Sequence, residues 1–268
     1  MGAVKIENRK SKIEKPLRFL IYTAESPARD LALEEAIHTA VEDGLSANTW
    51  RLWQAAGPAV VLGTGLEAAK EVDLDAARAE GTPVLRRHSG GGAVVIGPGV
   101  INYSAFYLFK DLPGSETIRG AMSAALSPII STLAGWGLRV CEIGLSDLAV
   151  ACGGEDLRKI AGNAQARKKN SVLVHGTLLA RPDLERIARL LRYPSAAPEY
   201  RAGRAHRSFL TSLRELGAPH DLAAFAAGLA RALDCEANMV ETASMEEQRR
   251  AAKLLAEKYG TREWNLRR

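Results

Sequence analysis

Apolar residues along this chain gather, as far as Leu179, in short runs that are typical of β-strands. The first run is Arg18 to Tyr22, and turn-forming residues bound several of the others. The same pattern predicts the remaining strands and turns: strands at 48–53, 59–62, 83–87, 93–96, 101–108, 147–151, 160–166 and 172–179, a β-hairpin turn at Gly97-Pro98-Gly99, and a further turn at Gly153-Gly154.

Helices are predicted where apolar residues recur at helical spacing. Asp30 to Val41 repeats Leu31 and Ile37 on one face, and Asp30 is a residue type that caps a helix N-terminus. The same spacing predicts helices at 73–79, 116–133, 222–233 and 245–259. Because strands and helices do not alternate strictly, we predict an α+β fold with a mixed β-sheet and flanking helices.

Composition bounds the classes of protein that this chain can belong to. Hydrophobic residues make up 47% of the 268 positions, which is enough for one large core, and we expect 16–268 to form a single domain behind a mobile leader at 1–15. No apolar run reaches the length of a membrane span, and the N-terminus has no secretory h-region. We therefore expect a cytoplasmic protein.

Neither the cysteines nor the charge identifies a function. Cys141, Cys152 and Cys235 have no zinc-site spacing, so we expect reduced thiols and no zinc. A net charge of +5 suits nucleic acid, an anionic nucleotide or an acidic protein partner equally well.

The strongest local motif runs from Arg86 to Val94. Three consecutive glycines, Gly90 to Gly92, leave a turn without Cβ atoms, so its backbone can lie directly against a ligand. Arg86 and Arg87 supply fixed positive charge and paired donors for a carboxylate or phosphate. Taken alone, the motif fits a flexible loop with solvated arginines equally well.

Two later segments add to this motif. Lys159 precedes the small residues Ala161, Gly162 and Ala164, so it can reach a ligand that packs against this strand. His175 and Thr177 lie on an otherwise apolar strand. A lone lysine is more often a surface charge, and a lone histidine is more often structural.

The order and spacing of these segments, with Ser146-Asp147-Leu148 between them and Glu257 to Asn265 at the end, closely resembles the lipoate–protein ligase A family, which has the biotin/lipoate protein ligase catalytic domain. The resemblance covers about residues 18–268. It implies acyl-substrate binding by Arg87, Ser89, Gly90, Gly91, Gly92, His175 and Thr177, nucleotide binding by Asp147, Lys159, Gly162, Asn163 and Ala164, metal binding by Asp147, and catalysis by Lys159.

The resemblance implies an ATP-dependent lipoate–protein ligase. Lipoate or octanoate would react with ATP and Mg²⁺ to form an acyl-AMP, and the acyl group would pass to a lysine of a lipoyl-domain or glycine-cleavage-H-like carrier protein. Positioning and electrostatics suffice for this chemistry, without a protein nucleophile. Members of the family commonly have a His-Asp pair and a Gly-Asn after the glycines, where this chain has Ile96-Gly97 and Gly99-Val100.

Three other interpretations compete with the ligase. Octanoyltransferases share the fold and take the acyl group from an acyl carrier protein through a cysteine thioester without ATP; Cys141 lies near the position of that nucleophile, although no Pro-Cys-Phe pattern surrounds it. Gly63 to Ala68 loosely matches a dinucleotide-binding loop, which leaves Lys159 and His175 without a role. A nucleic-acid-binding module is the remaining interpretation, but this sequence shows no helix-turn-helix segment at either end. We therefore expect no nucleic acid as a partner, and no membrane, because no membrane span is found.

Two features of the later chain give further expectations. The arginine-rich stretch from Pro194 to Arg207 fits a surface loop that orders on ligand binding, but for most of its charges a solvated connection is the preferred interpretation. The sequence ends at Arg268 without the small C-terminal accessory domain of two-domain ligases, so we expect a separate small subunit to complete the enzyme. The choice between lipoate and octanoate stays open, because both present the same C8 chain and carboxylate.

Overall fold

The main sheet confirms the predicted mixed α+β architecture. The computed structural model describes residues 17–152, 157–235 and 239–267, so the expected leader and the Gly153-Gly154 turn lie outside the described residues. Eight strands form the sheet in the order β11-β1-β2-β6-β10-β9-β8-β7, with parallel pairs at β11-β1-β2 and antiparallel pairs elsewhere. Their bounds are β1 Arg18–Ile21, β2 Thr49–Trp53, β6 Val100–Leu108, β7 Val140–Ile143, β8 Asp147–Ala151, β9 Leu157–Arg167, β10 Ser171–Leu179 and β11 Met239–Val240.

A second, three-stranded sheet lies beside the first. β3 (Ala59–Leu62) pairs with β4 (Val84–Arg86) in parallel and with β5 (Val94–Ile96) antiparallel. The predicted hairpin between 93–96 and 101–108 is therefore wrong. β6 is already paired on both sides, with β2 and β10, and Gly97 and Gly99 adopt positive φ values of 146° and 86° where the chain passes between the sheets.

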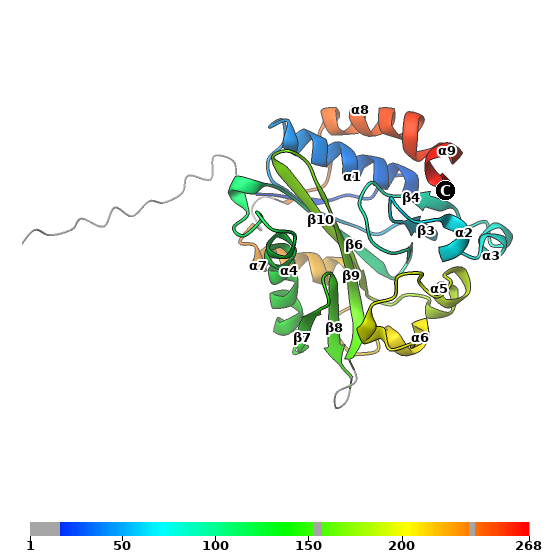
Figure 1. The fold of residues 1–268 in the computed structure, drawn as a ribbon. Coiled ribbons are helices and arrows are strands. Elements are labelled where there is room, and N and C mark those ends of the chain that lie inside the picture. The colour runs from blue at the N-terminus through cyan, green and yellow to red at the C-terminus, as the bar shows by residue number, and fades with distance from the viewer. Residues whose placement is uncertain (1–16, 153–156, 236–238, 268) are drawn as a thin grey trace, which may run out of the picture.

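Helices cover both faces of the main sheet (Figure 1). On one face lie α1 (Pro27–Glu42), α8 (Met245–Leu254) and the π-helical turn η4 (Leu255–Tyr259), with their own apolar cluster. On the other lie α4 (Ile118–Gly135) and α7 (Leu222–Ala232), which bury a second cluster around Phe225 and Trp50.

The predicted cap of the first helix is wrong. Ser26, not Asp30, is the N-cap of α1, and its hydroxyl accepts from the amide of Arg29. Asp30 lies one turn further on and forms a fully buried ion pair with Arg51 of β2. A buried carboxylate at this position therefore joins the helix to the sheet.

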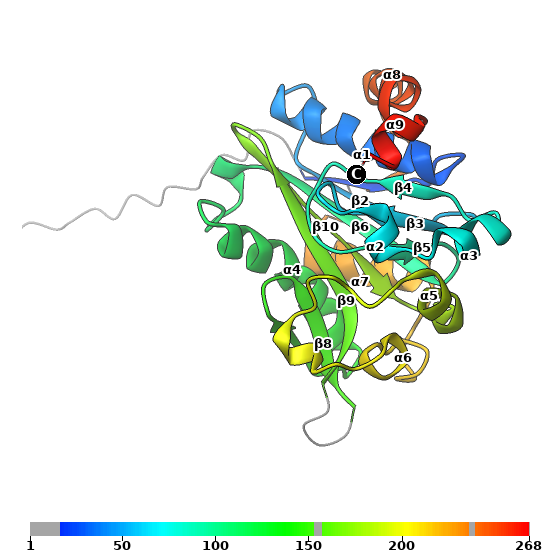
Figure 2. The same ribbon diagram turned by 45° about the vertical axis from the view of Figure 1, so that its right-hand side comes forward.

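A third apolar cluster surrounds the small sheet (Figure 2). It is formed with α2 (Ala68–Glu71), α3 (Leu74–Ala79), α5 (Leu184–Leu190) and α6 (His206–Phe209). The short turn η2 (Glu199–Arg201) lies between α5 and α6. The chain therefore places the arginine-rich stretch beside the small sheet and the end of β9.

The pairing of β8 with β9 contains a β-bulge that orients the site. Asp147 pairs with Gly162 and Leu148 with Ala161, but Ala149 pairs with Lys159, so Ile160 is an extra residue in β9. Ile160 and Ala161 are both buried in the core below the sheet. The bulge therefore returns Lys159 to the same face as Gly162, although their positions differ by three and a regular strand would place them on opposite faces.

Candidate functional site

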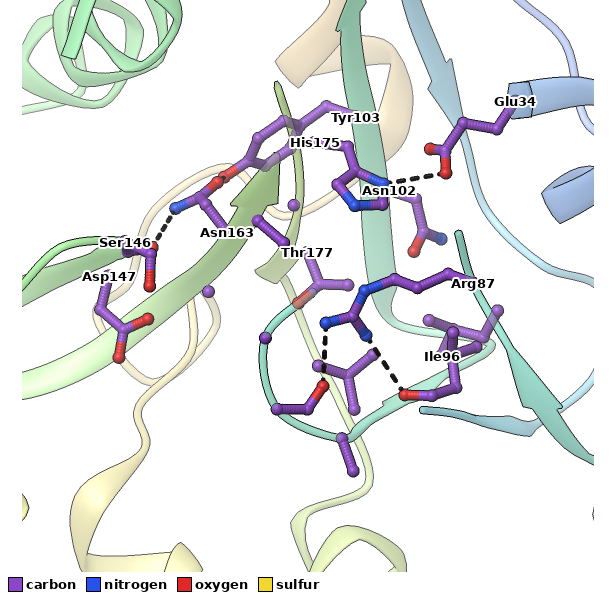
Figure 3. Close-up of a pocket in the computed structure, with 18 of the residues that line it drawn as sticks. Glu34, Arg87, Ile96, Asn102, Tyr103, Ser146, Asp147, Asn163, His175 and Thr177 are labelled. Atoms are coloured by element: carbon purple, nitrogen blue, oxygen red, sulfur yellow. Dashed lines mark hydrogen bonds and ion pairs between the residues drawn. The ribbon is translucent and has the colours of Figure 1, made fainter. Parts of the chain in front are cut away.

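The predicted site residues surround one cavity with two connected compartments. The first, drawn in Figure 3, has a volume of about 130 Å³ and is walled by Trp53, Val61, Ile96 and Tyr103 among others. The second is wider, at about 1120 Å³, and lies toward the 194–210 segment. Both compartments share Gly91, Gly92, Asp147, Lys159, Gly162 and Thr177, so these residues form the boundary between the compartments.

The glycine loop is held from inside by Arg87. The Arg87 guanidinium donates to the carbonyls of Gly90 (2.5 Å) and Gly92 (2.9 Å), and its Nε donates to Ser89 Oγ at 2.9 Å. Burial lowers the pKa of Arg87 to about 10, which still leaves it charged at neutral pH. The charged side chain therefore stabilises the loop conformation, and it also lines the first compartment.

Glycine is required where the loop meets a neighbouring turn. A Cβ on Gly63 would lie 2.0 Å from the carbonyl oxygen of Gly91, and Gly91 itself has a φ of 87°. The Gly63 to Ala68 segment thus packs against the glycine loop. The feature that resembled a dinucleotide-binding loop has this structural role.

Arg86 points away from the cavity, contrary to the expectation that both arginines serve a ligand. Its side chain donates to the carbonyls of Gly63 (3.0 Å), Leu66 (2.7 Å) and Arg267 (2.9 Å). Its own amide donates to Asn265 Oδ1 of α9 (Arg262–Asn265) at 2.9 Å. Arg86 therefore ties the C-terminal helix to the turn that supports the glycine loop.

A buried hydrogen-bonded chain crosses the inner end of the first compartment. His175 Nε2 lies 2.6 Å from Ser89 Oγ, and His175 Nδ1 lies 2.9 Å from a carboxylate oxygen of Glu34. Ser104 donates to the other Glu34 oxygen at 2.6 Å. Burial alone would raise the pKa of Glu34, but His175 and the hydrogen bonds lower it to about 2. Glu34 is thus a carboxylate that fixes the orientation of the His175 ring.

Lys159 and Asp147 form an ion pair at the boundary. Lys159 Nζ lies 2.9 Å from Asp147 Oδ1, and the Tyr200 hydroxyl donates to Asp147 Oδ2. A Cβ on Gly162 would lie 2.7 Å from Lys159 Nζ, so the lysine arm occupies space that only glycine leaves open. Burial, followed by the charge of Asp147, raises the pKa of Tyr200, which therefore stays protonated.

Asn163 is fixed within the wall. It accepts a hydrogen bond from the Tyr103 hydroxyl, and its amide nitrogen donates to the carbonyl of Ser146 at 2.7 Å. A Cβ on Gly176 would lie 2.2 Å from Asn163 Oδ1, so the neighbouring strand makes room for this amide. Ala164 and Thr177 complete the predicted set in the wall. The structure therefore brings together every predicted site residue except Ser89 and Gly90, which support the lining from behind.

A neutral histidine pair lies behind the glycine loop. The rings of His38 and His88 are 5.8 Å apart, and burial lowers their pKa values to about 3 and about 4. His88 Nδ1 lies 3.4 Å from the Tyr259 hydroxyl, which donates to Glu35. Both rings are therefore uncharged at neutral pH.

Cys141 lies on the cavity side of the edge strand β7. It pairs with Ala149, and Ala149 pairs with Lys159, so the three residues form one row across the strands. The next residue on the same side, Ile143, lines the second compartment. The Cys141 side chain is exposed and does not line either compartment.

The described residues form no cluster of metal-ligand side chains. Among them, no three His, Cys, Asp or Glu side chains are placed to hold a metal ion, and both oxygens of Asp147 are engaged by Lys159 and Tyr200. These residues do not fit a Mg²⁺ ion held by the protein alone. Nor does any helix in the described part of the chain have the length and apolar character needed to cross a membrane.

Several residues of the site were missed at the sequence level: Glu34, Trp53, Asn102, Tyr103 and Tyr200. Glu34 had a usable signal, because it is a charged residue three positions from both Leu31 and Ile37 on the apolar face of a helix. The others are ordinary strand or loop residues, and only the tertiary fold brings them to the cavity.

Comparisons with known proteins agree with this geometry. The family model of the lipoyl protein ligase A/B catalytic domain matches residues 26–234. The octanoyltransferase LipM of Symbiobacterium thermophilum is 32% identical over 93% of this chain and 98% of its own length. The bipartite lipoate protein ligase of Thermoplasma acidophilum superposes with a TM-score of 0.77 at 24% identity, covering 93% of this chain and 95% of that one. Lipoate-protein ligase A bound with ATP gives 0.75 at 24% identity, covering 94% and 99%.

Proposed function

Because the chain belongs to the lipoyl protein ligase A/B catalytic-domain family, we propose that it transfers a C8 acyl group to a lysine side chain of a carrier protein, with an octanoyl thioester as donor and Cys141 as nucleophile. The likeness to an octanoyltransferase over nearly the full length of both chains supports this donor. The order of the two leading interpretations from the sequence is thereby reversed.

The observation that carries the proposal is the row formed by Cys141, Ala149 and Lys159. Residues paired across neighbouring strands share a face, and strands lie about 4.8 Å apart, so the thiol and the lysine lie on one surface with only an alanine methyl between them. Two strand spacings put Cys141 and Lys159 about 10 Å apart on that surface.

The reaction has two balanced half-steps. The Cys141 thiolate attacks the carbonyl carbon of the octanoyl thioester, the donor thiolate leaves and takes up a proton, and a new thioester forms on Cys141. The neutral amine of the carrier lysine then attacks this thioester. An amide bond forms, the C–S bond breaks, and the proton lost by the amine returns to the Cys141 sulfur.

Lys159 supports both half-steps as an electrostatic residue. Each attack places negative charge on the carbonyl oxygen, and an ammonium already fixed by Asp147 stabilises that charge without further reorganisation. The narrow first compartment is lined by Leu31, Trp53 and Val61 and suits an unbranched apolar tail. Burial of the tail contributes about 0.8 kcal/mol per methylene.

Adenylation is the second candidate, and one observation favours it. The second compartment is wide enough for a nucleotide and meets the first at Lys159, whereas Cys141 lines neither. In this reaction the acid would attack the α-phosphate of ATP, pyrophosphate would leave, and the carrier amine would displace AMP from the acyl-AMP. Mg²⁺ would then be held chiefly by the phosphates, because both oxygens of Asp147 are engaged by Lys159 and Tyr200. If adenylation is the reaction, we expect a separate small accessory subunit to complete the enzyme.

The decisive experiment offers both donors to the purified chain. We expect octanoyl transfer from octanoyl-acyl carrier protein to a lipoyl domain without ATP, an octanoylated Cys141 in mass spectrometry, and loss of transfer in Cys141→Ser. Cys152→Ser is the matched control, because Cys152 is a partly exposed thiol at the end of the neighbouring strand. ATP–pyrophosphate exchange with full activity in Cys141→Ser would establish adenylation instead.

A further inference from the structure

The arginine-rich stretch, predicted to be a solvated connection, contains a buried guanidinium. Arg201 is only 3% exposed, and its guanidinium lies 4.7 Å from the ring of Tyr193 and 4.9 Å from that of Phe209. Nε donates to the carbonyl of Arg204 at 2.8 Å. Nη2 is buried and has no hydrogen-bond partner among the described residues. A buried polar donor without a partner costs free energy, so its retention calls for an explanation.

No carboxylate in the described residues neutralises this group. None of the ion pairs found there includes Arg201. Three acids line the second compartment: Asp147 is bonded to Lys159 and Tyr200, Glu71 is bonded to Ser195, and Glu199 forms no ion pair with Arg201 among the described residues.

A second cation and a histidine line the same compartment. Lys159 and His206 line it together with Arg201. Burial, followed by the charges of Arg201 and Lys159, lowers the pKa of His206 to about 4. His206 is therefore neutral, and the cations of this compartment are Lys159 and Arg201.

We infer that Arg201 is a binding residue for a phosphate ester carried by the acyl donor. A guanidinium whose faces are stacked on aromatic rings presents its edge donors to a ligand, and that edge matches phosphate oxygens. Arg201 lines the second compartment, and its Nη2 donor has no partner among the described residues, so a phosphate that binds there has a donor available to it.

The choice of phosphate over carboxylate rests on the proposed acyl transfer. If the tail fills the first compartment, the reacting carbonyl lies at the boundary formed by Lys159 and Gly162. The part of the donor that extends into the second compartment is then its leaving group. Both donor classes carry phosphate there: an acyl-AMP carries an acyl phosphate esterified to the ribose, and a phosphopantetheine thioester carries a phosphodiester.

Calorimetric binding of donor fragments tests the inference without acyl transfer. The full chain is titrated with AMP and adenosine, and with 4′-phosphopantetheine and pantetheine, as wild type and as Arg201→Gln. The matched control is Arg207→Gln, because Arg207 lies on the same segment, is exposed and is paired with Glu185. In the wild type we expect one phosphorylated fragment to bind at least about tenfold more tightly than its partner without phosphate, as one charge-assisted hydrogen bond provides.

Arg201→Gln should abolish that preference and Arg207→Gln should keep it. The fragment that shows the preference identifies the donor class. Equal binding of both members of each pair by the wild type overturns the inference, as does a preference that survives in Arg201→Gln. If this variant does not fold, hydrogen exchange of 193–209 in the wild type, slowed by the phosphorylated fragment alone, supports the inference and equal exchange overturns it. Octanoyl transfer assayed in parallel fails or succeeds independently, so the two proposals are judged separately.

Discussion

In the first compartment the guanidinium of Arg87 donates to carbonyls of its own loop, whereas in the second the guanidinium of Arg201 leaves Nη2 without a partner among the described residues. The inner network of Ser89, His175 and Glu34 is likewise closed on itself. The polar groups of the first compartment are therefore satisfied by folding, whereas we propose that Arg201 of the second compartment is satisfied when the donor binds. Substitutions inside should reduce stability, and substitutions outside should reduce activity.

The largest effect is expected from Glu34→Ala. Removing this carboxylate leaves His175 and Ser104 buried without their partner, which should cost about 3–5 kcal/mol of unfolding free energy. Urea unfolding measures it. Glu25→Ala is the control just before the same helix, because Glu25 is exposed and pairs with Arg29 at the surface, so its loss should cost about 1 kcal/mol or less. Equal losses of unfolding free energy in the two variants would show that the network of Ser89, His175 and Glu34 stabilises the fold no more than a surface contact does.

Lys159→Ala tests the boundary between the compartments. We expect acyl transfer to fall by about 10² to 10³ while the melting temperature changes little, because the ammonium acts on charge that develops in the transition state. Steady-state transfer and thermal unfolding are measured on the same preparation. Transfer within a factor of a few of the wild type would remove Lys159 from the catalytic role.

Acid should destabilise the inner region through the buried histidines. The pKa values of His38 and His88 are lowered by burial to about 3 and about 4, so below about pH 6.5 the unfolded chain binds protons that the folded chain refuses. Stability should therefore fall as the pH drops from about 6.5 to about 4, and Glu34 extends the loss from about 4.5 toward 2. His38→Leu should reduce the slope of unfolding free energy against pH between about pH 6.5 and 4 by about one proton. His220→Leu, at an exposed position, should leave that slope unchanged.

The smallest effect on stability is expected from Arg201→Met. Replacing a buried guanidinium that has no ion-pair partner among the described residues by an apolar side chain should leave the unfolding free energy within about 1 kcal/mol of the wild type, or raise it. Arg87→Met should instead lose at least about 1.5 kcal/mol, because hydrogen bonds from its charge are satisfied within the protein. Comparable losses in both variants, measured by urea unfolding, would erase the contrast between the compartments.

Local patterns were enough to predict the glycine loop, the lysine strand and most elements of the mixed sheet. What could not be predicted is which partner each hydrogen-bond donor reaches. Arg86 and Arg87 are adjacent and chemically identical, yet the alternation of a strand end sends one to the C-terminal helix and the other into the loop. Long-range partners decide such roles, and adjacent residues do not report them.

The same limit explains the misplaced elements. Gly97 and Gly99 were correctly identified as turn residues, but a turn does not specify whether the strands around it pair with each other or join different sheets. Arg201 was grouped with solvated arginines, because the aromatic rings that enclose it come from Tyr193 and Phe209 at the two ends of the segment.

The extra residue at Ile160 has a consequence for how this site is inherited. Because side chains alternate along a strand, the bulge acts as a parity device: it determines whether Lys159 faces the cavity or the core. Deleting Ile160 would leave every functional residue present and yet place the ammonium among the apolar residues below the sheet. A single-codon deletion here is thus more damaging than most substitutions, and an alignment that overlooks the bulge would assign the lysine of a relative to the wrong face.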